Sequence, residues 1–186
     1  TFIVTEPDSL QAIITDTTDA VCSYSANGQA IVTPIGGTAL YSYDWYDVAG
    51  GDNDSVASGI IPGTYHVEVK DVNGCIDTGE VVINSPAALN LVPDSIVSTC
   101  SGICTGSAIV IPSGGVTPYF YNWYNAGNQT NDTASNLCAG FYDVEVTDIN
   151  GCIDTLEVEV TEPVTIIASA VDSSAVTCHG GNDGSA

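Results

Sequence analysis

The chain has 186 residues, and its 23 acidic side chains face a single Lys or Arg, which gives a formal net charge of −22 at pH 7. This charge excludes nucleic acid as a partner, because a duplex requires clustered Lys and Arg to displace its counterions. A hydrophobic content of 44% is too high for a disordered acidic tail, and no run of about 18 apolar residues is present that could span a membrane.

The first half of the chain carries the period-two pattern of short β-strands. In chain order, we expect strands at residues 10–15, 29–33, 41–46, around 56, at 66–70 and at 76–83. Turns rich in Gly, Asn and Asp join them, and Asn73-Gly74 is the strongest hairpin signal because both residues tolerate positive φ. No segment has the apolar stripe of a helix. Short alternating strands of this kind predict an antiparallel β-sandwich.

The same series of blocks then recurs, with Cys22 and Cys75 matched by Cys100 and Cys152, 78 and 77 residues later. We therefore expect the last strand of a preceding repeat at 1–7, repeat 1 at 8–86, repeat 2 at 87–163 and the start of a following repeat at 164–186. Only about five residues join the strands of successive repeats, and they include Pro and no Gly, so the linker cannot behave as a flexible coil. The fold class predicted is all-β: tandem immunoglobulin-like antiparallel β-sandwich repeats stacked as an end-to-end rod.

Seven cysteines predict disulfides and an oxidising compartment. We expect each repeat to close its own pair, Cys22 with Cys75 and Cys100 with Cys152, which leaves Cys178 to a partner beyond residue 186.

The two remaining cysteines, Cys104 and Cys138, correspond in repeat 1 to Ala26 and to Ile60 or Ile61. An apolar pair replaced by a sulfur pair indicates two positions in contact, which predicts a Cys104–Cys138 bond. A local loop to Cys100 and a metal-binding pair stay open as alternatives.

A catalytic interpretation has little support, because the chain has only two histidines, His66 and His179. His66 is replaced by Asp143 in repeat 2, so we predict no enzyme and no cofactor. Calcium is the one metal to consider, since Asp71 and Asn73 in repeat 1, and Asp148 and Asn150 in repeat 2, resemble half of an oxygen-rich calcium loop. A plain hairpin turn explains the same four residues.

Two short patterns suggest glycosylation. Asp followed by Ser or Thr occurs in both repeats and makes Ser55, Thr133, Thr17 and Ser95 candidates for O-glycans. An Asx turn or a Ser/Thr turn is the alternative at each of them. Asn53, Asn128 and Asn131 also fit the N-x-S/T acceptor pattern for N-glycans.

Four blocks of the sequence resemble the SprB-type repeat of giant cell-surface adhesins from gliding Bacteroidetes. They are CHGGNDGSA at 178–186, GGVTPYFYNW at 114–123, AGFYDVEVTDINGC at 139–152 and the closing TEP at 161–163. The resemblance implies an extracellular β-sandwich array exported by the type IX system and associated with gliding motility. Repeat 1 departs from the pattern in its opening residues 22–28, and the pair Cys104 and Cys138 is an addition.

These observations predict a non-enzymatic structural and adhesive stalk, part of a long extracellular adhesin or filament on the cell surface. The expected partners are neighbouring repeats of the same chain, with surface polysaccharide and lateral copies in a filament as further options. The alternative is a carbohydrate- or calcium-binding accessory module of a secreted protein. Such a module requires exposed aromatic side chains on one face of every repeat, whereas Trp45 and Trp123 lie in apolar strands and are expected in the core.

Overall fold

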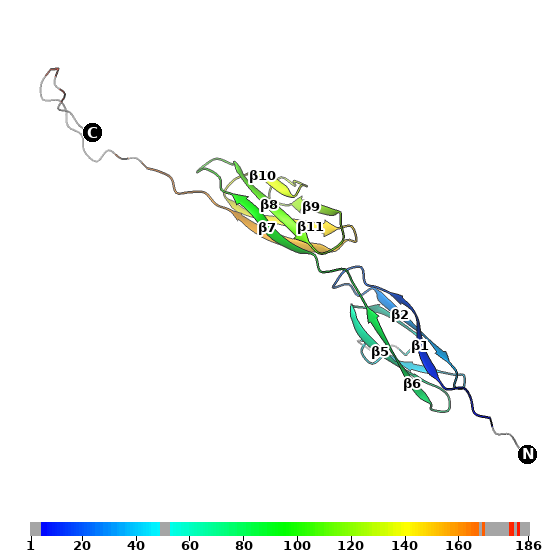
Figure 1. The fold of residues 1–186 in the computed structure, drawn as a ribbon. Helices are drawn as coiled ribbons and strands as arrows, with labels where there is room; N and C mark the ends of the chain where they lie inside the picture. The colour runs from blue at the N-terminus through cyan, green and yellow to red at the C-terminus, as the bar shows by residue number, and fades with distance from the viewer. Residues whose placement is uncertain (1–4, 49–52, 168, 170–178, 181, 183–186) are drawn as a thin grey trace, which may run out of the picture.

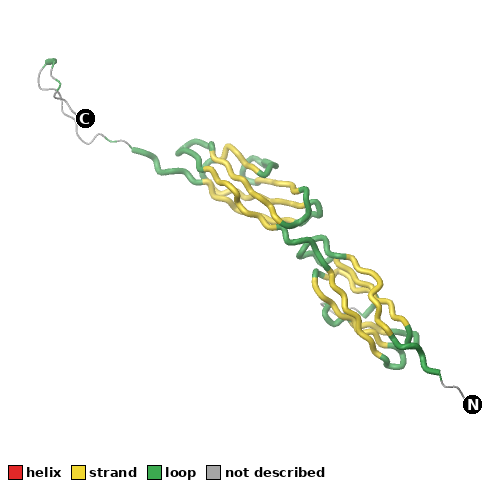
Figure 2. The backbone as a smooth tube through the Cα atoms, viewed as in Figure 1, coloured by secondary structure: helices red, strands yellow, loops and turns green. Residues whose placement is uncertain are grey.

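A computed structural model describes residues 5–48, 53–167, 169, 179–180 and 182. Over these residues the ordered elements are strands, and none is a helix that could cross a membrane (Figure 2). Two six-stranded bodies result: sandwich 1, built from residues 11–83, and sandwich 2, built from residues 90–160. The expected end of a preceding repeat at 1–7 and start of a following repeat at 164–186 lie mainly outside the described residues.

Sandwich 1 consists of two three-stranded antiparallel sheets, one in the order β1-β2-β4 and the other in the order β3-β5-β6. All the strands expected from the sequence are present, each within a few residues of its expected place. Their bounds are β1 Gln11–Thr18, β2 Gly28–Ile35, β3 Ser42–Asp44, β4 Val56–Ile60, β5 Gly63–Lys70 and β6 Ile76–Ile83.

Sandwich 2 repeats this topology with sheets in the order β7-β8-β10 and β9-β11-β12. The bounds are β7 Asn90–Val97, β8 Gly106–Ser113, β9 Tyr119–Trp123, β10 Thr133–Leu137, β11 Gly140–Asp148 and β12 Ile153–Val160. The β-bulge recurs as well, after Ile14 in β1 and after Pro93 in β7.

The strand order is immunoglobulin-like. An immunoglobulin sandwich pairs strands A-B-E-D and C-F-G, and both bodies here reproduce A-B-E and C-F-G, without a D strand among the described residues. A tyrosine corner is also present, since the Tyr65 hydroxyl donates to the Ile61 carbonyl at 2.7 Å and the Tyr142 hydroxyl donates to the Cys138 carbonyl at 3.1 Å. The tandem immunoglobulin-like sandwich predicted from the sequence is thus confirmed.

Each core is built on a tryptophan at the end of the third strand. Trp45 and Trp123 are fully buried, and their indole N–H groups donate to the carbonyls of Asp54 and Asn131. The alternating strands place one face of each sheet against this ring, because successive side chains of a strand point to opposite faces. In sandwich 1 the core includes Ala30, Val32, Val67, Val69 and Ile83, and in sandwich 2 it includes Ala108, Val110, Val144, Val146 and Val160.

A glycine fixes the bend that follows the second strand of each sandwich. Gly36 and Gly114 have φ values of +72° and +71°, and a Cβ atom would lie 2.2 Å from the Ser9 carbonyl oxygen and 2.0 Å from that of Ala88. No other residue fits such a close approach of two backbones, so the glycine is required in both repeats.

The two sandwiches follow one another end to end (Figure 1). Strands β1 and β6 run in the same direction, so β6 leaves sandwich 1 at the end where β1 also finishes. That end faces sandwich 2, and the opposite end carries the β5–β6 turn. This polarity decides which residues of the two bodies can meet.

Candidate functional site

The junction between the sandwiches begins with a linker, residues 84–89, that is bonded to both bodies. On the side of sandwich 1, the Asn84 carbonyl accepts from the Ala20 N–H at 2.9 Å and the Asn84 N–H donates to the Asp19 carboxylate at 2.8 Å. On the side of sandwich 2, the Ala87 carbonyl accepts from the Gly115 N–H at 2.8 Å. Only Ser85 and Pro86 lie between these attachments, and Pro86 has a restricted φ.

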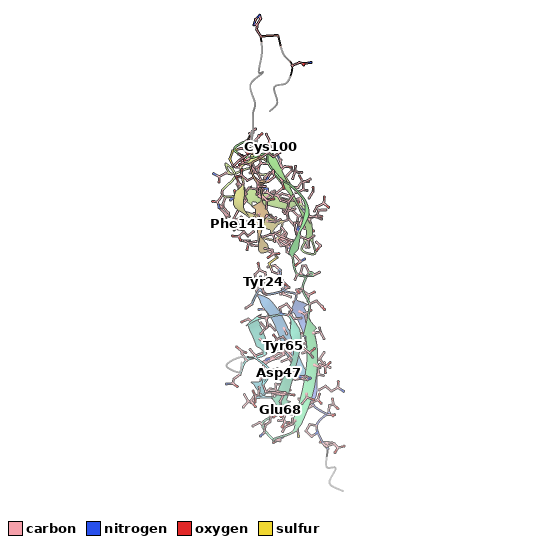
Figure 3. All side chains as sticks on the ribbon, turned by 90° about the vertical axis from the view of Figure 1, so that its left-hand side faces the viewer. Tyr24, Asp47, Tyr65, Glu68, Cys100 and Phe141 are labelled. Atoms are coloured by element: carbon pink, nitrogen blue, oxygen red, sulfur yellow. A yellow bond between two sulfur atoms is a disulfide. The ribbon has the colours of Figure 1, made fainter. Side chains whose placement is uncertain are left out.

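A disulfide between Cys22 and Cys152 joins the two sandwiches a second time, with a Cα–Cα distance of 5.7 Å. Both cysteines are buried. Around the bond, the Ile153 N–H donates to the Tyr24 hydroxyl at 2.9 Å, and the Asn150 side-chain amide donates to the Val21 carbonyl at 3.4 Å. The loop after β1 therefore docks on the β11–β12 turn, and Tyr24 lies at this boundary in Figure 3.

The β11–β12 turn is rigid because a carboxylate holds its backbone. Asp148 is buried and accepts N–H donors from Val116, Asn150 and Cys152 at 2.8–2.9 Å. The Cys152 sulfur is thus presented to sandwich 1 from a fixed backbone.

Asp71 supports the matching turn of sandwich 1 with N–H donors from Thr38, Asn73 and Cys75 at 2.8–2.9 Å. These bonds, first that from Thr38 and then those from Cys75 and Asn73, hold the pKa of Asp71 below its usual value, although burial acts in the opposite direction.

The expected bonds Cys22–Cys75 and Cys100–Cys152 are wrong. Cys22 bonds Cys152 instead, and Cys75 and Cys100 are free and exposed. The reason is strand polarity: Cys22 follows the end of β1, whereas Cys75 precedes the start of the co-directional β6, so a strand length of about 26 Å separates them. A disulfide requires Cα atoms within about 7 Å. The Asn73-Gly74 hairpin does not fix the direction of β6 relative to β1, because the chain crosses between the two sheets before it reaches β5. Nothing in the sequence singled out Tyr24, Val21 or Ile153.

Cys104 and Cys138 do form a disulfide in sandwich 2, the pairing that the sequence favoured. Their counterparts in sandwich 1 are Ala26 and Ile61, because Ile61 accepts the tyrosine-corner bond there as Cys138 does in sandwich 2. Ala26 and Ile61 line one hollow of about 370 Å³, so the two positions also face each other in sandwich 1.

The four residues considered for calcium lie in these two turns. The Asp71 and Asp148 carboxylates accept backbone N–H groups, the Asn73 amide donates to the Thr38 hydroxyl at 2.8 Å, and the Asn150 amide donates to the Val21 carbonyl. Within the described ranges, no cluster of three or more His, Cys, Asp or Glu side chains is arranged to hold a metal ion. These are the bonds of hairpin turns, and calcium binding at these four residues stays a prediction.

The candidate O-glycosylation sites are not equivalent between the repeats. Ile31 pairs with Val56, and its counterpart Ile109 pairs with Thr133, so Thr133 takes the position of Val56 rather than that of Ser55. Thr17 pairs with Ala30, whose counterpart Ala108 pairs with Ile96 rather than with Ser95. The Asp-Ser/Thr pattern therefore recurs in both repeats with a displacement of one residue in the sheet register.

Local bonds are also present at three of these sites. Asp16, Asp54 and Asp132 accept hydrogen bonds from the Thr17 N–H, from Ser55 and from the Thr133 hydroxyl. Glycosylation of Ser55, Thr133, Thr17 and Ser95 stays a prediction.

His66 lies on the outer face of β5 between two carboxylates. Its Nδ1 contacts Asp47, its Nε2 is 3.2 Å from the Glu80 carboxylate, and Tyr46 stacks on the ring at 5.9 Å between centroids. The Asp47 hydrogen bond raises the pKa of His66, opposed by burial and assisted by the Glu80 hydrogen bond. Both ring nitrogens thus contact acids, and neither contacts a nucleophile, so the cluster does not have the arrangement of a hydrolytic triad. His179 is exposed, in a turn.

Fold and junction together define a tandem immunoglobulin-like protein whose units are covalently linked. The SprB repeat family model matches residues 14–50, which confirms the resemblance to SprB repeats over that segment. Among curated proteins, none matches the sequence significantly.

Solved structures that resemble the chain are tandem immunoglobulin domains. The first two domains of DIP-gamma share 9% identity with a TM-score of 0.40, covering 84% of this chain and 99% of that one. The ectodomain of mouse nectin-like molecule 4 shares 13% identity with a TM-score of 0.35, covering 87% and 67%. A Dscam structure shares 11% identity with a TM-score of 0.35, covering 85% of this chain and 47% of that one, so the chain spans about half of its length.

Proposed function

We propose that this chain is a non-enzymatic structural segment of a long extracellular adhesin or filament, in which linked sandwiches form a stalk. The observation that carries the proposal is the junction: a linker bonded to both bodies, a buried disulfide and two hydrogen bonds between side chain and backbone. Two covalent connections between rigid bodies restrict their relative rotation, and this restriction gives a stalk a defined direction.

The disulfide bonds support an extracellular, cell-surface location. Four cysteines are bonded in the structure, and such bonds persist in oxidising environments rather than in the cytosol. With a net charge of −22, the stalks repel one another and stay separate in solution. Association with gliding motility and export by the type IX system follow from the SprB resemblance and belong to the proposal.

Small-angle scattering on the full chain tests the stalk. We expect a maximum dimension close to two sandwich lengths plus the terminal segments, with a narrow distribution of angles between the sandwiches. The double variant Cys22→Ser, Cys152→Ser is the matched comparison, because it removes the bond while leaving both cores intact. It should broaden the angle distribution without unfolding either sandwich.

Two results would contradict the proposal. One is a compact particle in which the sandwiches lie side by side. The other is an angle distribution for the oxidised chain as broad as that of the double variant, which would show that the junction does not orient the units.

A further inference from the structure

Two cysteines of the described chain are free, and they lie at the two ends that face away from the junction. Cys75 is in the β5–β6 turn of sandwich 1, and Cys100 is in the loop after β7 of sandwich 2. Figure 3 shows Cys100 at the end of its sandwich opposite to the boundary where Tyr24 lies. The two thiols are therefore too far apart to bond within one chain.

Cys75 occupies in sandwich 1 the position that Cys152 occupies in sandwich 2. Each follows an Asn-Gly turn, and each donates its N–H to the turn carboxylate, Asp71 or Asp148, at 2.8 and 2.9 Å. Their environments differ in one respect: Cys152 is covered by the loop of another sandwich and bonded, whereas Cys75 is exposed.

Cys100 likewise occupies the position of Cys22. In both loops the cysteine carbonyl closes a turn, accepting the Ser25 N–H at 3.1 Å in sandwich 1 and the Ile103 N–H at 3.0 Å in sandwich 2. Cys22 is buried and bonded, and Cys100 is exposed and free. Each sandwich thus has an opening cysteine at one end and a turn cysteine at the other.

A hollow lies on the surface beside Cys75. A hollow of about 280 Å³ is lined there by residues that include Asp8, Leu10, Asp71, Cys75 and Ile76. In sandwich 2 the counterparts of Cys75 and Ile76 are Cys152 and Ile153, and these receive Cys22 and the Tyr24 hydroxyl.

We propose that Cys75 and Cys100 are the two halves of further disulfides of the Cys22–Cys152 kind, each formed with another copy of the repeat. Cys75 receives the opening cysteine of one unit, and Cys100 bonds the turn cysteine of a different unit. The contact joins unlike ends, so it does not close on itself and extends along an array. The array becomes a ladder in which every unit is bonded to both neighbours.

The oxidation has a defined balance. Two thiols lose two protons and two electrons to form each S–S bond, and a disulfide oxidant, either an oxidoreductase or a small-molecule disulfide, is reduced to two thiols. The loop at Cys100 lacks the tyrosine, because Gly102 takes the position of Tyr24, and the Gly102 N–H donates to the Glu162 carboxylate at 3.1 Å.

A chain with three complete units tests the proposal. A second copy of residues 87–163 is inserted after residue 163 of the full chain, so that Pro163 precedes the added Ala87 as Pro86 precedes Ala87 in the natural linker. The protein is then refolded in a glutathione redox buffer. Non-reducing peptide mapping should find Cys100 bonded to the Cys152 of the added copy, beside the original Cys22–Cys152 bond. The Cys100→Ser variant is the control, and it should lose the new bond alone.

A free Cys100 in the three-unit chain would overturn the proposal, and so would a bond from Cys100 to a cysteine of its own sandwich. Mapping of the unmodified chain gives a second, independent reading, because a Cys22–Cys75 bond there would remove the pattern on which the ladder is built. The inference rests on the repeat geometry rather than on the stalk function. A flexible chain that forms the predicted disulfides would contradict the proposed stalk function and leave the disulfide proposal standing.

Discussion

Sandwich 1 and sandwich 2 share one topology, yet they differ beside the tyrosine corner. Sandwich 2 has the Cys104–Cys138 disulfide there, and sandwich 1 has Ala26 and Ile61 around a hollow of about 370 Å³. The residues that determine the fold are kept, namely the central tryptophan, the corner tyrosine and the turn aspartate. The repeats therefore vary in how they are stabilised while the ends that join them stay alike.

Removing the Cys104–Cys138 bond should have the largest effect. The double variant Cys104→Ala, Cys138→Ala should lower the stability of sandwich 2 by about 4 kcal/mol, because the bond restricts a loop of some 35 residues in the unfolded chain. Sandwich 1 should be unaffected. The chain has one tryptophan in each body, so Trp45→Phe makes fluorescence report sandwich 2 during urea unfolding, and Trp123→Phe makes it report sandwich 1.

The reciprocal variant, which introduces a disulfide into sandwich 1, tests the same comparison. Ala26→Cys with Ile61→Cys should give sandwich 1 a bond of the same kind and raise its stability by about 2–4 kcal/mol.

Two outcomes of removing Cys104 and Cys138 would show that their bond is not what distinguishes the repeats. One is a loss of stability in both sandwiches, and the other is a loss below about 1 kcal/mol.

Replacing Asp71 should have the next largest effect, confined to sandwich 1. Asp71→Ala leaves the N–H groups of Thr38, Asn73 and Cys75 without their carboxylate acceptor. Since the folded state lowers the pKa of Asp71, its stabilisation is present above the usual carboxyl pKa and is lost as pH falls through the lower, folded-state value. Urea unfolding of the Trp123→Phe form between about pH 5 and pH 2 measures this.

The Asp71 variant should be less stable at neutral pH and less sensitive to acid. Asp44→Asn, an exposed carboxylate on β3, serves as the control and should keep the acid sensitivity of the parent. An unchanged acid profile in Asp71→Ala would contradict the role given to this turn.

The smallest expected effect comes from His66. Because the Asp47 contact raises the pKa of His66, its contribution to stability is complete below the usual histidine pKa and is lost as pH rises through the higher, folded-state value. Sandwich 2 has Asp143 and Asn125 at these positions, 3.5 Å apart, so it should show no such change. NMR titration of the imidazole should give a lower pKa in Asp47→Asn, whereas an equal pKa would show that the contact does not form in solution.

The sandwich fold could be predicted because both of its signals are local. Period-two alternation at 66–70 and the Asn73-Gly74 turn each involve neighbouring residues, and the repeat supplies a second copy of both. The Cys104–Cys138 pair could be predicted by comparing the repeats, because the counterparts Ala26 and Ile61 are apolar residues of the kind that two contacting positions carry.

The junction could not be predicted in the same way. Both intra-repeat pairings fit the cysteine count, and only the direction of β1 relative to β6 separates Cys22 from Cys75. The contact between Tyr24 and Ile153 joins residues 129 positions apart on two different bodies, and no pattern within either segment indicates it.

The Cys22–Cys152 bond also changes how the chain would carry tension. A force applied at the two termini follows the shortest covalent route, which leaves the backbone at Cys22, crosses the sulfur bridge and continues from Cys152. The chain between the two cysteines, a separation of 130 residues, then carries no load. At roughly 3.5 Å per residue it corresponds to about 450 Å of extended chain. With the disulfide intact, the molecule should therefore extend little under force. After reduction of the disulfide, the chain between the two cysteines should become available for extension.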